Sequence, residues 1–86
     1  MLKMLNKHLN ELVELLLKVK TKEQMENLLL GLFTAKELEE LPNRVKIVKM
    51  LKKGIPQQEI AERLKVGIAT VTRGSRELRL GRFKYI

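Results

Sequence analysis

Small polar and basic side chains share one face of a segment near the C-terminus. The segment from Ile68 to about Leu80 is predicted to be helical, and six residues are expected on its outer face: Ala69, Thr70, Thr72, Arg73, Arg76 and Arg79. Small groups near the start of a helix can approach the edges of DNA bases, and the arginines that follow can reach guanine or phosphate. The arrangement suits a DNA major groove, although an ordinary basic helix would share this composition by chance.

The segment before this helix has the features of the first helix of a helix-turn-helix. Pro56 marks the start of a helix predicted for residues 57–64, and a turn at residues 65–67 precedes the second helix. Ala61 supplies the small residue that the motif needs where its helices cross. The residues expected to close the small core are Ile60, Leu64, Val66, Ile68 and Val71. The pattern predicts a helix-turn-helix within residues 55–80.

Gly74 lies in the middle of the second helix, where glycine costs about 1 kcal/mol relative to alanine. The helix either tolerates this cost or needs the space, because a ligand, a phosphate or another helix approaches its backbone. With Arg73 beside the glycine and Arg44 on a preceding helix, an anionic small molecule is one candidate. The residues alone do not choose among these alternatives.

Residues 1–53 are predicted to form a helical core through which the chain dimerises, although the first helix could instead be a core helix of a monomer. Residues 2–20 carry apolar side chains at alternating spacings of three and four, typical of a helix packed lengthwise against another: Leu2, Leu5, Leu9, Leu12, Leu16 and Val19. Thr21 and Gln24 predict a capping box that opens a short second helix, which Gly31 interrupts. The side chains that this second helix is expected to bury are Met25, Leu28, Leu29 and Leu32.

A third helix is predicted to open with a second capping box at residues 34–37. Pro42 predicts either an end near Leu41 followed by a new start, or a kink. Beyond it, the side chains expected to face inward are Val45, Ile47, Val48 and Leu51, and those expected outward are Arg44, Lys46, Lys49, Lys52 and Lys53. Gly54 is predicted to end this helix, and Gly81 the last one, leaving a basic tail at residues 81–86.

Length predicts one small domain over residues 1–86, and the helical spacings, with no convincing β pattern, predict an all-α class of about five helices. The chain has no cysteine, which excludes disulfides and suits a reducing cytoplasm. Apolar residues make up 44% and aromatic residues 3%, and a chain this short buries so many leucines best as an oligomer. No apolar run is long enough to span a membrane. An enzyme is not expected, because the chain shows no activated nucleophile, paired carboxylates, phosphate loop or metal-ligand partner for His8.

Charge divides the chain into two unlike halves. Residues 1–43 hold 6 Lys or Arg against 7 Glu, whereas residues 44–86 hold 12 Lys or Arg against 3 Glu. A basic half attracts polyanions through counterion release, with DNA, RNA and acidic membranes all eligible. Charge therefore supports a polyanionic partner but does not choose among DNA, RNA and an acidic membrane.

The run Gly67-Ile68-Ala69-Thr70-Val71-Thr72-Arg73-Gly74-Ser75 resembles the recognition helix of the tryptophan repressor family, and residues 34, 43–48 and 54 match that family's spacing upstream. The resemblance covers about residues 30–78. It implies an intertwined all-α homodimer that reads successive major grooves of a pseudo-palindromic operator, positioned by bound tryptophan. It also implies that Ile68, Ala69, Thr70, Thr72 and Arg73 face the operator, with Gln57 and Gln58 near phosphates.

The resemblance implies a corepressor pocket as well. Arg44 and Arg73 match the two arginines that enclose the indole, Thr34 the threonine at the carboxylate, and Gly74 the glycine that leaves space. Glu77 stands where the family has a serine at the ligand's amino group, and Gly31 where it has a leucine. Glu77 would either pair with an ammonium group or fill the pocket and pair with Arg44 or Arg73.

Two features of length also depart from the family. The interval from Gly54 to Gly67 is one residue shorter, and the chain ends soon after the recognition helix. Without the family's last helix, the tail from Phe83 to Ile86 or a longer N-terminal contact is expected to cover the dimer core.

The leading hypothesis is a cytoplasmic homodimeric regulator, a repressor of transcription that binds double-stranded DNA. Its DNA contacts would include Arg76, and L-tryptophan or a related amino acid is its candidate corepressor. One alternative is a regulator of the same family that needs no ligand. Another is a basic protein-interaction or RNA-binding module.

Overall fold

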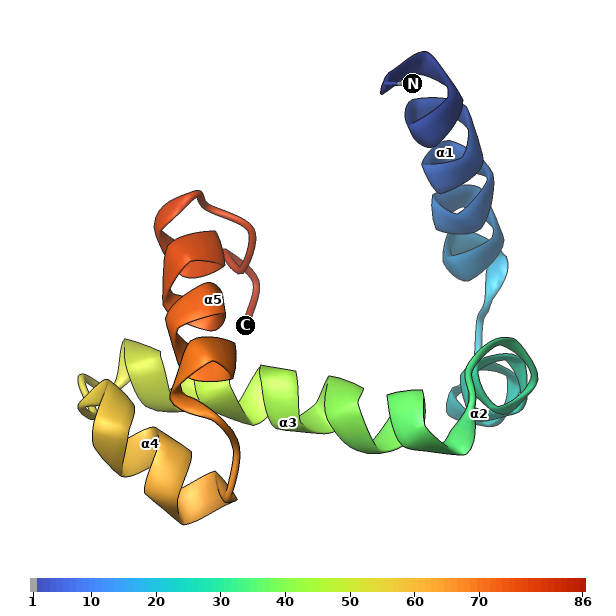
Figure 1. Ribbon diagram of the computed structural model, residues 1–86. Helices are drawn as coiled ribbons and strands as arrows, with labels where there is room; N and C mark the ends of the chain where they lie inside the picture. Colours follow the sequence, from blue (N-terminus) through green and yellow to red (C-terminus); the bar gives the residue numbers. More distant parts are fainter. Residues whose placement is uncertain (1) are drawn as a thin grey trace. The chain divides into compact units, whose positions relative to one another are not determined.

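A computed structural model describes the backbone of residues 2–86 and the side chains from Asn6 onward. Figure 1 shows its five helices, which are α1 (Leu2–Lys18), α2 (Lys22–Leu32), α3 (Ala35–Lys52), α4 (Gln57–Leu64) and α5 (Ile68–Arg79). The predicted all-α class and the number of helices are confirmed. The chain divides into a first compact unit up to Ala35 and a second from Lys36 to Ile86, and each is described by itself. The predicted single domain, with its division near residue 54, stays a prediction.

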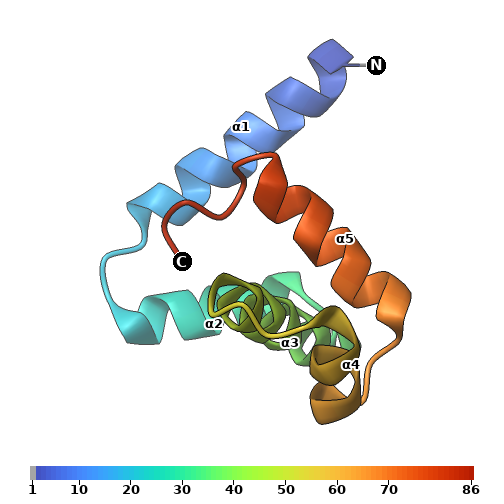
Figure 2. The same cartoon turned by 90° about the vertical axis from the view of Figure 1, so that its left-hand side faces the viewer.

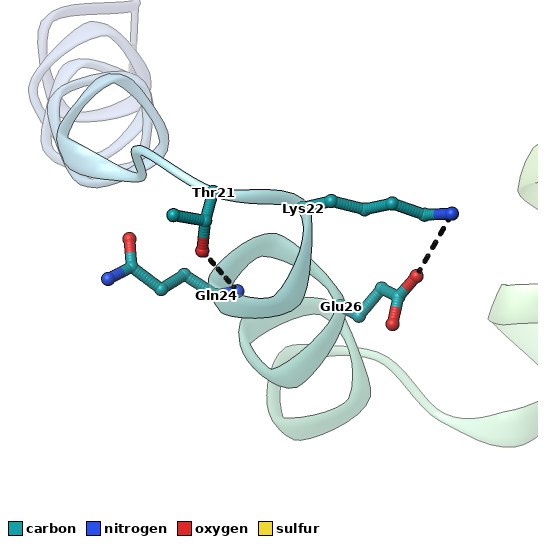
Figure 3. A network of polar contacts seen from close by, with 4 residues as sticks. All are labelled: Thr21, Lys22, Gln24 and Glu26. Atoms are coloured by element: carbon teal, nitrogen blue, oxygen red, sulfur yellow. Dashed lines mark hydrogen bonds and ion pairs between the residues drawn. The ribbon is translucent and has the colours of Figure 1, made fainter.

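In the first unit, a threonine cap starts α2 as predicted (Figure 3). Thr21 has extended backbone angles (φ −127°, ψ 158°), and its hydroxyl oxygen accepts a hydrogen bond of 3.1 Å from the Gln24 N–H. The side chain of Gln24 accepts from the N–H of Lys20 at 3.0 Å, one residue before the one that a capping box predicts. One half of the box is therefore confirmed, and the other half is shifted.

Two predictions for the first unit are wrong. Gly31 does not interrupt α2, which continues to Leu32 and ends at Phe33, whose N–H bonds the carbonyl of Leu29. Leu32 is 46% exposed, and no residue of α2 is fully buried. In α1 the large apolar side chains with substantial exposure are Leu9, Leu12, Val13, Leu15 and Leu17. These side chains occupy more than one side of α1, and so much exposed apolar area on one helix needs a covering surface.

In the second unit, α3 runs through Pro42 without interruption. The prediction that a helix ends near Leu41 and restarts is therefore wrong. Proline lacks the N–H that would bond the carbonyl of Leu38, so this part of the helix loses one hydrogen bond. Tertiary packing farther along α3 compensates, because Ile47 and Val48 are each 1% exposed.

The core of the second unit joins α3 to the helix-turn-helix. Ile47, Ile60 and Val71 form a buried cluster, and the half-buried residues packed against it are Met50, Leu51, Ile55, Ala61, Leu64 and Val66. Two residues predicted to face inward do not, since Val45 is 40% and Ile68 is 47% exposed. The core thus fixes α5 through Val71, and Ile68 is left outside.

We expect Ile60→Ala to lower the free energy of unfolding by about 2–5 kcal/mol, because it removes most of a completely buried side chain and leaves a cavity. Val45→Ala is the matched control on an exposed aliphatic side chain and should change stability by about 0.5 kcal/mol or less. Urea unfolding followed by circular dichroism measures both. Equal losses would contradict the core assigned here.

Candidate functional site

The turn between α4 and α5 sets the angle at which the two helices meet (Figure 2). Lys65 adopts the left-handed conformation (φ 55°, ψ 45°), which is uncommon for a residue with a side chain. The following N–H, from Val66, donates to the carbonyl of Ala61 at 3.1 Å. The predicted bounds of α4 and the turn at residues 65–67 are confirmed. After this turn, the first residues of α5 lie outside the core and are exposed.

The two sides of α5 differ in exposure. Val71 is fully buried, and the half-buried residues beside it are Gly74, Ser75, Glu77 and Leu78. Because a helix advances about 100° per residue, the opposite side forms a continuous stripe. We call this exposed stripe the outer face of α5, and it consists of Ile68, Ala69, Thr70, Thr72, Arg73, Arg76 and Arg79. Except for Ile68, these are the residues that the pattern predicted to be exposed.

One hydrogen bond links the outer face to the start of α4. The hydroxyl of Thr72 donates to the side-chain carbonyl of Gln57 at 2.8 Å. Gln57 is half-buried, and its neighbour Gln58 is exposed. Sequence reasoning assigned these residues separate contacts and gave no sign that Thr72 and Gln57 bond each other. The bond restrains two polar groups that would otherwise choose among several rotamers.

The outer face of α5 is basic, and no carboxylate of the described residues engages its arginines. Within the described residues, Arg73, Arg76 and Arg79 form no ion pair, whereas Arg63 pairs with Glu59 on α4. Unpaired guanidinium groups on an exposed helix keep their full charge for a polyanion. The geometry therefore favours binding of phosphate-rich surfaces.

Gly74 lies where α5 crosses α3. A Cβ added to Gly74 would lie 3.1 Å from the Cγ2 of Ile47 and 3.8 Å from the Cδ1 of Leu51. A neighbouring helix, one of the alternatives that the sequence left open, does approach the backbone of Gly74. The glycine thus permits the close approach of α5 to the core.

The remaining residues of the predicted corepressor pocket do not all meet. The carboxylate of Glu77, 26% exposed, lies 3.4 Å from Nε of Arg82 rather than beside Arg44 or Arg73. Arg44 lies 3.8 Å from Glu40, one helical turn before it, and both are about half exposed. Thr34 belongs to the first unit, so its place in a pocket stays a prediction.

The described residues contain neither a cluster of metal-binding side chains nor a helix that could span a membrane. No three His, Asp or Glu side chains gather there in a way that could hold a metal ion. None of the helices from Leu2 onward combines the length and apolar character that a membrane crossing requires.

Comparison with known proteins gave consistent matches. The family described as "Trp repressor protein" matches residues 7–85. The Trp operon repressor homolog of Vibrio vulnificus is 45% identical over 71 residues, which cover 81% of this chain and 70% of that protein. The homologs of Vibrio campbellii and Vibrio cholerae are 46% and 44% identical over 70 residues, covering 80% of this chain and 70% and 68% of theirs. No solved structure matches.

Proposed function

Because this chain belongs to the Trp repressor family, we propose that it represses transcription by binding double-stranded DNA as a homodimer. The outer face of α5 is the proposed reading surface. The observation that carries the proposal is the basic, exposed face itself, whose arginines form no ion pair with any described residue, while Val71 on the other side is fully buried. A rigid helix with small residues first and arginines after them suits a major groove.

In the proposed complex, successive residues of the outer face make different contacts with the DNA. Ala69 and Thr70 lie in the first turn, where short side chains let the backbone approach base edges. Arg73 and Arg76 follow and reach guanine or phosphate. Thr72, held by Gln57, presents its hydroxyl in a fixed position near the backbone of the duplex. Gln58 adds a polar contact to phosphate from the start of α4.

The exposed apolar side chains of α1 support the dimer. Leu9 is 53% and Leu17 is 77% exposed in the single chain, and monomeric proteins rarely leave so much apolar surface uncovered. A second copy of this chain would bury these side chains. Dimers with this motif read half-sites one turn of DNA, about 34 Å, apart.

Titration of a duplex selected for binding, against a scrambled duplex of the same composition, tests the DNA-binding proposal. We expect the selected duplex to bind more tightly, and the logarithm of its affinity to fall linearly with the logarithm of salt concentration. Equal affinity for both duplexes would favour the alternative of a basic RNA-binding or protein-interaction module. Light scattering on the same samples gives the oligomeric state.

We further propose that DNA binding by this chain needs no amino-acid corepressor. Three contacts argue against a pocket of the family's kind: Glu77 is engaged by Arg82, Arg44 faces Glu40, and Gly74 abuts Ile47. A carboxylate at residue 77 also adds negative charge where the family's serine has none. The engagement of Glu77 is the observation that favours this alternative over L-tryptophan as corepressor.

Adding L-tryptophan should therefore leave both the affinity for DNA and the thermal unfolding temperature unchanged. Isothermal calorimetry should give a flat titration for the natural chain. Glu77→Ser restores the family's residue and serves as the comparison. Heat of binding in the natural chain, together with tighter DNA binding, would contradict this proposal and return L-tryptophan as the corepressor.

A further inference from the structure

The segment after α5 turns back and is held to the end of α3 by a lysine. Gly81 adopts a positive φ of 84°, and the chain reverses its direction there (Figure 1). The ammonium group of Lys52 donates to two backbone oxygens of the tail, residues 81–86. These are the backbone oxygens of Phe83 at 2.6 Å and of Ile86, the last residue, at 2.5 Å. The sequence predicted only that Lys52 faces outward.

The same tail is tied to the last turn of α5. The N–H groups of Gly81 and Arg82 donate to the carbonyls of Leu78 at 3.0 Å and Glu77 at 3.2 Å. The side chain of Arg82 adds its contact with the carboxylate of Glu77 at 3.4 Å. The tail therefore bridges two helices, with Lys52 joining it to α3 and Glu77 joining it to α5.

The two halves of α5 are fixed by different means. Val71 in the core and the bond from Thr72 to Gln57 hold the first half. In the second half, Gly74 contacts α3, and Leu78 is only half-buried. The tail adds the hydrogen bonds from Gly81 and Arg82 to Leu78 and Glu77 in that half. Bonds from an ammonium group to carbonyls are stronger than neutral ones, so Lys52 is a substantial part of this restraint.

We propose that Lys52 is a positioning residue for DNA recognition, which holds the tail between α3 and α5 and thereby fixes the direction of the reading helix. This inference rests on the proposed function. It gives Lys52 a role unlike that of its neighbour Lys53, whose side chain forms no hydrogen bond or ion pair within the described residues. Two of the three N–H groups of Lys52 are committed to the tail, which leaves its charge in place but restricts its reach to a phosphate.

The salt dependence of DNA affinity distinguishes a positioning role of Lys52 from a direct contact between Lys52 and phosphate. The probes are a duplex enriched by the natural protein from a random-sequence library and a scrambled duplex. We expect Lys52→Ala to weaken binding of the enriched duplex about three- to tenfold, with the scrambled duplex and the salt slope unchanged. Lys52→Arg keeps the donors and should retain most of the affinity. Lys53→Ala is the matched control. It should leave the ratio of the affinity for the enriched duplex to the affinity for the scrambled duplex unchanged.

A uniform loss on both duplexes, with a salt slope reduced by about one, would make Lys52 a phosphate contact and overturn the inference. No change in affinity would overturn it as well. Hydrogen exchange without DNA tests the restraint independently of the proposed function. The amides of Gly81 and Arg82 should exchange faster in Lys52→Ala and not in Lys53→Ala, and equal rates would refute the role of Lys52. If the natural protein enriches no duplex, the proposed function fails, while the exchange result still decides whether Lys52 holds the tail.

Discussion

Replacing Arg73 with glutamate is expected to abolish sequence-specific binding of DNA. Arg73 is exposed in the middle of the outer face of α5 and has no carboxylate partner among the described residues. A good arginine contact to a base is worth about 1–3 kcal/mol, and a dimer makes each contact twice. The new carboxylate would also repel phosphate. We therefore expect a loss of at least about a hundredfold in affinity, measured by fluorescence anisotropy with a selected duplex.

Lys20→Glu is the control for net charge, because it makes the same change in the first unit, outside α5. It should lower affinity far less, and the loss should shrink as salt is added. Arg73→Glu should leave the unfolding transition nearly unchanged, since the residue is exposed. Equal losses from the two variants would mean that total charge, and not the outer face of α5, governs binding.

Gly74→Leu is expected to destabilise the second unit and to remove DNA binding with it. A Cβ at residue 74 already lies 3.1 Å from Ile47, whose side chain is buried and has little room to move. Further atoms must push α5 away from α3, and overpacking of this kind costs about 1–3 kcal/mol or more. The gain in helix propensity, about 1 kcal/mol, does not offset that cost. Urea unfolding measures the loss of stability.

Gly31→Leu is a matched control in another helix. A Cβ added to Gly31 meets no atom within 4 Å, so the same substitution there should keep or raise stability. If both variants unfold at the same urea concentration, the close approach of α5 to α3 does not explain why residue 74 is glycine.

The helix-turn-helix was predictable because the residues that start and end its helices act locally. Pro56 marks the start of α4, a three-residue turn follows, and Gly81 ends the last helix with a positive φ. Ala61 and Val71 stand at the helical spacing that one buried face requires. Patterns of this kind depend on neighbours in sequence, so they can be recognised without knowledge of the tertiary structure.

The errors arose where the local preference of a residue did not decide its structure. Gly31 and Pro42 are unfavourable inside helices, yet α2 and α3 continue through both. Burial of Ile47 and Val48 offsets the cost of Pro42 in α3, whereas α2 has no fully buried residue, so packing does not explain Gly31. Ile68 fits a core by type, but the turn before it directs the side chain outward. The bonds of Lys52 join residues 31 and 34 positions apart, and no periodicity reveals such a contact.

We propose that two copies of α5 read DNA in successive major grooves. Selection of duplexes from a random library by the natural protein, followed by sequencing, tests this arrangement. We expect enrichment of an inverted repeat whose half-sites are centred about one helical turn apart. Enrichment of a single unrepeated site, or of no sequence at all, would contradict it.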